Sequence, residues 1–158
     1  INFILAEYGQ AVDKAGQGTV LERASMACPA LPTCGLALAE SERYVPEFLG
    51  LVDNLMDAAG LSGEEIIVRM TGCPNGCPRP YMAELGIVGR SPGKYAVYLG
   101  GNVAGTRLAR LYNQNVPATE MTDHLRPLLE RYARHRRAAE RFGDFCAREV
   151  WPEIEVAI

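Results

Sequence analysis

Apolar residues recur at helical spacing in two long stretches of the 158-residue chain. The first stretch covers residues 36–59, where we expect Pro46 to break or kink the helix and Gly60 to end it. The second covers residues 119–141 and predicts a long helix with a bend near Pro127. The apolar stripe of this second helix contains Leu125, Leu128, Leu129 and Tyr132.

Short runs rich in β-branched and aromatic residues predict strands between these helices. Residues 66–68 follow a turn and favour a buried strand, while residues 86–89 and 95–99 favour a hairpin with its turn at 91–93. These elements predict the α+β class. The remaining expectations are an amphipathic helix that ends near residue 5, an extended segment over 20–27, and a short helix from Pro78 through residues 81–83.

Composition favours one folded domain over residues 1–158. The chain is 48% hydrophobic and 22% charged, which suffices for one substantial core. Because no apolar run reaches the length of a membrane span, we expect a cytoplasmic protein without a membrane partner. A net charge of −3 gives no reason to expect a nucleic-acid partner. Basic residues outnumber acidic ones over 126–148, which favours a solvated helix face over an edge that contacts an anion or a partner.

Four of the five cysteines form two close pairs, Cys28 with Cys34 and Cys73 with Cys77. The pairs are distant in sequence, so two loops must converge if all four thiolates are to act together. Thiolates are soft, anionic ligands that match iron and discriminate against magnesium or calcium. The pattern therefore favours an iron–sulfur cubane.

Two other uses of these thiols stay open at this point. Zinc binds four cysteines in many structural sites, and the loop 74–76 has a suitable length, although the loop 29–33 is longer and more apolar than a usual zinc knuckle. Disulfides rank last, because we see no secretory leader and no dense cysteine framework, and the thiols of a cytosolic protein normally stay reduced.

Glycines and prolines suit the two cysteine loops to a cluster. Gly72 and Gly76 allow tight turns that bring peptide N–H groups close to sulfur, where hydrogen bonds stabilise added negative charge. Prolines at 29, 32, 74 and 78 stiffen the loops and reduce the entropy lost when a cluster binds.

Three other residues have no assigned chemistry. Cys146 stands apart from both pairs, and we expect a small buried thiol. His124 and His135 lie among charged neighbours on the predicted long helix, and we assign them no role.

Beyond spacing, the residues around the cysteines resemble a known family. The runs are MAC at 26–28, PTCGLALAE at 32–40, TGCPNGC at 71–77, LGGN at 99–102 and GTR at 105–107. They closely resemble the assimilatory sulfite reductase hemoproteins, within the siroheme and 4Fe–4S nitrite and sulfite reductase family, over about residues 25–145. Gly35 and Pro78 depart from the pattern, which tends to have proline and glycine there.

The resemblance implies a nitrite/sulfite reductase-type cluster domain, with a mixed sheet flanked by helices. It corresponds to the C-terminal part of a longer enzyme, and the start at Ile1 without a methionine agrees with a fragment. We expect residues 1–24 to lead in, residues 25–118 to form the cluster and siroheme region, and residues 119–158 to form C-terminal helices.

The resemblance also implies the site residues. A 4Fe–4S cluster would be held by Cys28, Cys34, Cys73 and Cys77, and Cys77 would also be the axial ligand of siroheme iron and so catalytic. Arg79 could stabilise nearby negative charge or point to water. Siroheme contacts are implied for Asn75, Gly100, Gly101, Asn102 and Arg107, although these glycines also suit an ordinary turn and this arginine a surface charge.

The implied activity is the six-electron reduction of sulfite to sulfide, at a siroheme coupled to the cluster through the shared thiolate. The implied partners are sulfite, an NADPH flavoprotein subunit or ferredoxin as electron donor, and the N-terminal remainder of the enzyme. Because that remainder would supply the residues that grip sulfite, we expect the fragment to be inactive alone. Three alternatives stay open, namely a ferredoxin-dependent nitrite reductase, an electron-transfer module without heme, and a zinc-stabilised binding domain.

Overall fold

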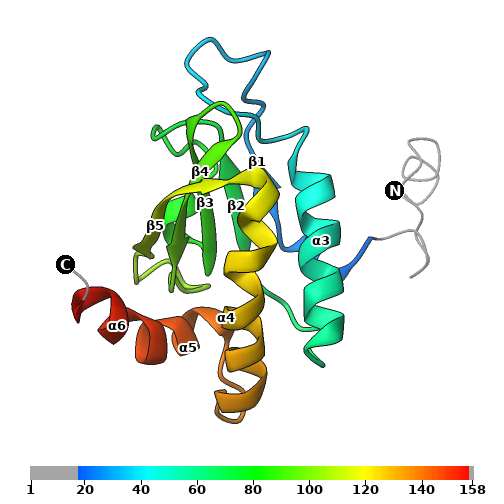
Figure 1. The fold of residues 1–158 in the computed structure, drawn as a ribbon, viewed down its shortest axis with the longest axis vertical. Coiled ribbons are helices and arrows are strands. Elements are labelled where there is room, and N and C mark those ends of the chain that lie inside the picture. Colours follow the sequence, from blue (N-terminus) through cyan, green and yellow to red (C-terminus); the bar gives the residue numbers. More distant parts are fainter. Residues whose placement is uncertain (1–17, 157–158) are drawn as a thin grey trace.

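A mixed five-stranded sheet forms the centre of the computed structural model, which describes residues 18–156. The strands lie in the order of the chain (Figure 1). β1 and β2 run parallel to each other, as do β2 and β3, whereas the β3–β4 and β4–β5 pairs are antiparallel. The strands are β1 (Met26–Ala27), β2 (Val68–Thr71), β3 (Leu85–Ser91), β4 (Lys94–Leu99) and β5 (Arg110–Pro117).

Two helices, α3 (Val45–Ala58) and α4 (Met121–His135), lie side by side on one face of this sheet (Figure 1). Their apolar stripes meet the inward side chains of the strands, which alternate along each strand. The shared core is fully buried and includes Phe48, Val52, Met70, Ile87, Val97, Leu125 and Leu129. This arrangement confirms the expected α+β class with a mixed sheet and helices.

The helices are shorter than the apolar pattern predicts. Pro46 occupies the first turn of α3, where its missing N–H needs no partner, so it begins the helix and does not break it. Residues 36–44 form turns instead, and Gly60 follows the helix with a φ of +75°. α4 ends at His135, because the chain turns at Arg136 toward a third, C-terminal segment. The buried stripe of α4 is confirmed.

The strand predictions are partly confirmed. The hairpin of β3 and β4 forms around its expected turn, but β2 begins at Val68, so residues 66 and 67 precede it. Residues 20–27 were expected to be extended, and this is wrong for their first half. Thr19 caps the helix α2 (Val20–Arg23) by a reciprocal pair of hydrogen bonds with Glu22. The short helix near Pro78 begins at Pro80 as a 3-10 turn, η2 (Pro80–Met82). The helix expected to end near residue 5 lies outside the described residues.

Three short helical pieces complete the chain: α5 (Phe142–Phe145), a π-helical turn (Cys146–Val150) and α6 (Trp151–Val156). They run away from the base of α4 (Figure 1). Cys146 is fully buried there, as expected, and burial raises the pKa of its thiol well above the usual range. Among residues 18–156 we find no helix that is both long and apolar enough to cross a membrane.

Candidate metal centre

The two cysteine loops meet at one edge of the sheet. β1 and β2 are parallel, so their carboxyl ends, which lead into Cys28 and Cys73, lie side by side. The Cys28 amide donates to the Met70 carbonyl at 3.2 Å, and the Gly72 amide donates to the Cys28 sulfur at 3.3 Å. The Thr71 hydroxyl also lies 3.5 Å from that sulfur. Cys28 of the first cysteine loop is therefore hydrogen-bonded directly to the second cysteine loop.

Gly72 is the point of closest approach between the loops. Its carbonyl accepts hydrogen bonds from the Leu38 and Ala39 amides at 2.8 and 3.0 Å. A Cβ at this position would lie 2.6 Å from both the Ala30 side chain and the Ala39 carbonyl. Only glycine fits here, as the requirement for tight loops predicts.

The four sulfurs differ in exposure. Cys73 is buried, with 7% of its surface exposed, Cys28 and Cys34 are half-buried, and Cys77 is exposed on the outer turn of its loop. Cys34 lies in the loop between Cys28 and Leu38. Its amide donates to the Ala30 carbonyl at 2.6 Å. Within residues 18–156, no three Cys, His, Asp or Glu side chains gather closely enough to hold a single ion. A cubane differs, because its thiolates bind separate iron corners.

Both loops contain a non-glycine residue with positive φ, a conformation that L-residues rarely adopt. Ala30 has a φ of +49° and Arg79 a φ of +57°. Gly76, at +66°, sits between Cys73 and Cys77, and the Tyr81 hydroxyl donates to the Pro74 carbonyl at 3.0 Å. Strain of this kind is maintained where the surrounding structure requires a particular loop shape.

The glycine turn, residues 100–105, follows β4. It lies at the opposite end of the strands from the β3–β4 turn. The Asn102 side chain organises it, since its oxygen accepts from the Thr106 and Arg107 amides at 2.9 and 3.1 Å. Gly101 packs against the Ala83 carbonyl, just after η2, and so connects this turn with the segment that follows the second cysteine loop. Asn75, in contrast, is exposed within the second cysteine loop.

Arg107 and Trp151 hold this glycine turn in place. The Arg107 Nε–H donates to the Gly100 carbonyl at 2.7 Å, and a terminal nitrogen of the same guanidinium pairs with Asp144 at 2.6 Å. The Trp151 indole N–H donates to the Leu99 carbonyl at 2.9 Å. Arg107 therefore has structural partners here, and its role toward a siroheme stays a prediction.

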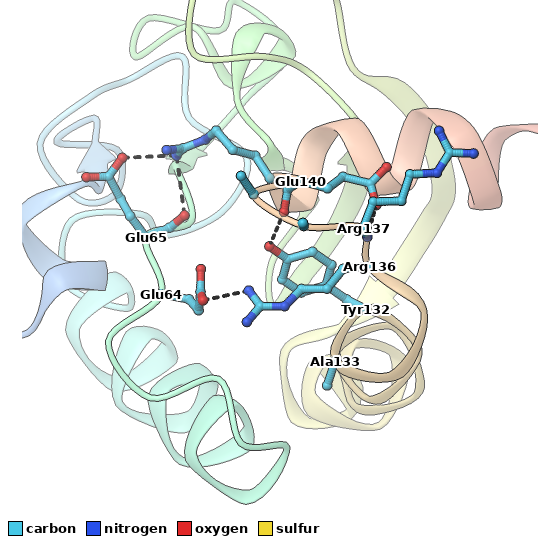
Figure 2. Close-up of a pocket in the computed structure, with 10 residues that line it drawn as sticks. Glu64, Glu65, Tyr132, Ala133, Arg136, Arg137 and Glu140 are labelled. Atoms are coloured by element: carbon cyan, nitrogen blue, oxygen red, sulfur yellow. Dashed lines mark hydrogen bonds and ion pairs between the residues drawn. The ribbon is translucent and has the colours of Figure 1, made fainter.

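Five arginines of the segment 126–148 form ion pairs with carboxylates: Arg131, Arg134, Arg136, Arg141 and Arg148. A pocket of about 530 Å³ lies among them (Figure 2). Arg136 pairs with Glu64 at 2.6 Å, and the Tyr132 hydroxyl donates to the Glu140 carbonyl at 2.8 Å. Glu64 precedes β2 whereas the cysteine loop follows it, so this pocket lies at the other end of the strand from the thiols.

Two residues with structural contacts around the site, Glu84 and Arg69, were not singled out from the sequence. Glu84 is 1% exposed and accepts hydrogen bonds from the Ile67 and Gly143 amides and from Arg141. Arg69, on β2, donates to the Pro78 carbonyl at 3.3 Å, directly after Cys77. A lone acidic residue in a basic stretch was the signal for Glu84, while Arg69 had none because its partner is a backbone carbonyl.

Comparison with known proteins first defines the fold class. No protein-family model matches the chain. The solved structure of the Mycobacterium tuberculosis NirA protein superposes with a TM-score of 0.74 at 24% identity, covering 93% of this chain and 28% of that one. The chain thus has the fold of a NirA-type α+β domain, which confirms the expected architecture.

Relatives with similar sequences indicate the family more narrowly than the fold does. The NADPH sulfite reductase hemoprotein beta-component of Staphylococcus carnosus is 52% identical over 149 residues, which are 94% of this chain and 26% of the relative. That of Chromohalobacter salexigens is 54% identical over 132 residues, 84% of this chain and 23% of the relative. The chain therefore spans about a quarter of its relatives' length and is homologous to that part of the sulfite reductase hemoproteins. The resemblance seen in its motifs is confirmed.

Proposed function

We propose that this chain is the redox-cofactor part of a sulfite reductase. The proposal rests on the hydrogen bond that the Gly72 amide donates to the Cys28 sulfur at 3.3 Å, which joins the two cysteine loops. In the proposal Cys28, Cys34, Cys73 and Cys77 hold one 4Fe–4S cluster. The loops fit the group, since their thiolate donors suit iron and a peptide N–H already points at one sulfur.

Donor chemistry and loop length favour iron–sulfur chemistry over zinc. Soft thiolates suit iron, and the loop 29–33 is longer and more apolar than a usual zinc knuckle. Cys77 is the exposed thiolate of the four, and it would also hold the siroheme when that group is bound. A bound siroheme and cluster would supply the electron chemistry that reduces sulfite to sulfide.

The chain's own residues position these groups. Gly72 and Gly76 shape the second loop, Asn75 lies exposed beside Cys77, and Arg107 and Asn102 fix the glycine turn of Gly100 and Gly101. In the proposal this turn and Asn75 would help to hold the siroheme. The same proposal takes residues 25–118 as the cofactor region, residues 119–158 as the C-terminal part and residues 1–24 as the lead-in.

Two further parts of the proposal concern partners. The relatives are named as the beta-component of an NADPH sulfite reductase, so we propose a flavoprotein partner as electron donor and sulfite as substrate. Residues that bind sulfite would come from the remainder of a longer polypeptide, because the matched part is 26% of the relative's length.

Cys77→Ser in the complete polypeptide tests the shared thiolate. The variant is expected to lose the optical and magnetic coupling between heme and cluster and most sulfite reduction, whereas Cys146→Ser, which alters a buried thiol outside both loops, keeps both. Parental coupling and rate in Cys77→Ser would contradict the bridging role. A parental protein that reduces nitrite but not sulfite would replace the substrate with nitrite.

A further inference from the structure

Positive charge is concentrated in the part of the chain that carries the second cysteine loop. Between Glu65 and Glu120 the sequence contains six basic residues and a single acidic residue, Glu84, although the whole chain has a net charge of −3. The six are Arg69, Arg79, Arg90, Lys94, Arg107 and Arg110.

The few carboxylates nearby are already engaged elsewhere. Glu84 pairs with Arg141 at 2.9 Å, and Asp144 pairs with Arg107 at 2.6 Å. Within residues 18–156, no ion pair joins Arg69, Arg79 or Arg90 to a carboxylate. Three guanidinium charges thus lack a compensating acid in the described part of the chain.

A hydrogen bond, chain position and strand register bring these three arginines near the second cysteine loop. Arg69 is half-buried and donates to the Pro78 carbonyl, one residue beyond Cys77. Arg79 follows directly in the chain and is close enough to Arg69 that it lowers the pKa of that guanidinium, after the larger effect of burial. Like charges this close repel each other, so the loop is a place where added negative charge is stabilised.

Strand pairing brings Arg90 to the same edge. Val88 on β3 pairs with Thr71 on β2, and Gly89 packs directly against the Gly72 carbonyl. The same parallel register places Gly89 beside Gly72 and Arg90 beside Cys73. Burial raises the pKa of the Tyr81 hydroxyl, and Arg90 is near enough to oppose that rise. The same hydroxyl donates to the Pro74 carbonyl, between the two cysteines, at 3.0 Å.

We propose that Arg69, Arg79 and Arg90 form a cationic rim that makes the cluster bound by the cysteines easier to reduce. This inference rests on the proposed function. A cluster that gains one electron becomes more negative, so fixed positive charges close to its ligands stabilise the reduced state more than the oxidised state. Arg69 has the largest effect, because it is half-buried and less screened by salt than the two exposed arginines.

A redox titration of the anaerobically purified complete polypeptide tests the rim. Dithionite supplies the electron, and the electron paramagnetic resonance signal of the reduced cluster is the readout. At the parental midpoint potential, Arg69→Gln is expected to lower the ratio of reduced to oxidised cluster by about threefold or more. Arg79→Asn and Arg90→Gln are expected to lower this ratio less. Asparagine is chosen at position 79 because it tolerates the left-handed backbone there.

Two controls separate charge from other effects. Arg69→Lys keeps the charge and is expected to stay near the parental ratio, while Arg126→Gln removes an exposed charge on α4, on the helical face of the sheet, and is expected to change nothing. If Arg69→Gln does not retain the cluster, the ratios measured for Arg79→Asn and Arg90→Gln test the inference instead. Unchanged ratios at all rim positions, or an equal shift in Arg126→Gln, would overturn the inference. A parental protein without iron and sulfide would instead defeat the proposed function.

Discussion

Glu84 is the residue through which the C-terminal segment meets the sheet. Its two carboxylate oxygens accept four hydrogen bonds, one backbone amide and one guanidinium nitrogen on each oxygen. A buried carboxylate is costly unless every lone pair finds a donor, and here the Ile67 and Gly143 amides and Arg141 supply them. The residue therefore ties residues 141–143 to the segment that precedes β2.

Glu84→Gln tests this role. Either orientation of the new amide places its NH₂ group against a backbone N–H, of Ile67 or of Gly143, so a buried donor loses its acceptor. We expect a loss of about 1–3 kcal/mol in the free energy of unfolding, measured by denaturant titration.

Glu130→Gln is the matched control for Glu84→Gln. It removes an exposed pair with Arg134 at 3.7 Å and is expected to cost no more than about 0.5 kcal/mol. Equal losses in both variants would contradict the view of Glu84 as a buried anchor.

At the scale of elements, local signals predict those helices and strands whose pattern and packing agree. The β3–β4 hairpin was predictable, because two continuous apolar runs flank a Pro-Gly turn. β5 was not, because its side chains are mostly polar and half-exposed at the sheet edge, and only pairing with β4 makes it a strand. Pro46 was ambiguous in the sequence, since proline both begins and breaks helices.

The turn after β4 depends on the C-terminal segment that covers it. Gly100 has a φ of +92°, and a Cβ there would lie 2.5 Å from the Trp151 indole nitrogen. Gly100→Ala is therefore expected to destabilise the protein by more than Gly93→Ala, which has a φ of +67° but open space around it. Backbone strain alone costs about 1–3 kcal/mol at either site, so the difference in thermal unfolding measures the clash. Equal shifts would show that Trp151 does not pack on this turn.

Acid stability tests the link between α4's end and the π-helical turn. The Arg148 guanidinium, aided by the Arg137 amide, lowers the pKa of Glu140 to about 2. A carboxylate with a depressed folded pKa stabilises the fold above its unfolded pKa, near 4.5, and loses that contribution as the pH falls toward 2. Parental protein should therefore lose stability more steeply between pH 5 and pH 2 than Glu140→Gln. Parallel curves would contradict this pairing.

For the whole molecule, the sequence identified the cysteine loops but not the charges around them. The expectation that the loops meet came from the requirement that four thiolates act together, and the tight turns and N–H donors at Gly72 and Gly76 are local features that agree with it. Charge compensation is not local. The basic run of 126–148 pairs with carboxylates distant in sequence, such as Glu64 and Glu65, whereas the arginines of the cationic rim have no such partner in the described structure.

Iron and acid-labile sulfide analysis of the anaerobically purified complete polypeptide tests the central claim most directly. If the two loops enclose one cubane, each chain holds four irons and four sulfides, and Cys28→Ser and Cys73→Ser each lower that content. Tightly bound zinc without iron, or parental iron and sulfide content after either substitution, would contradict the account.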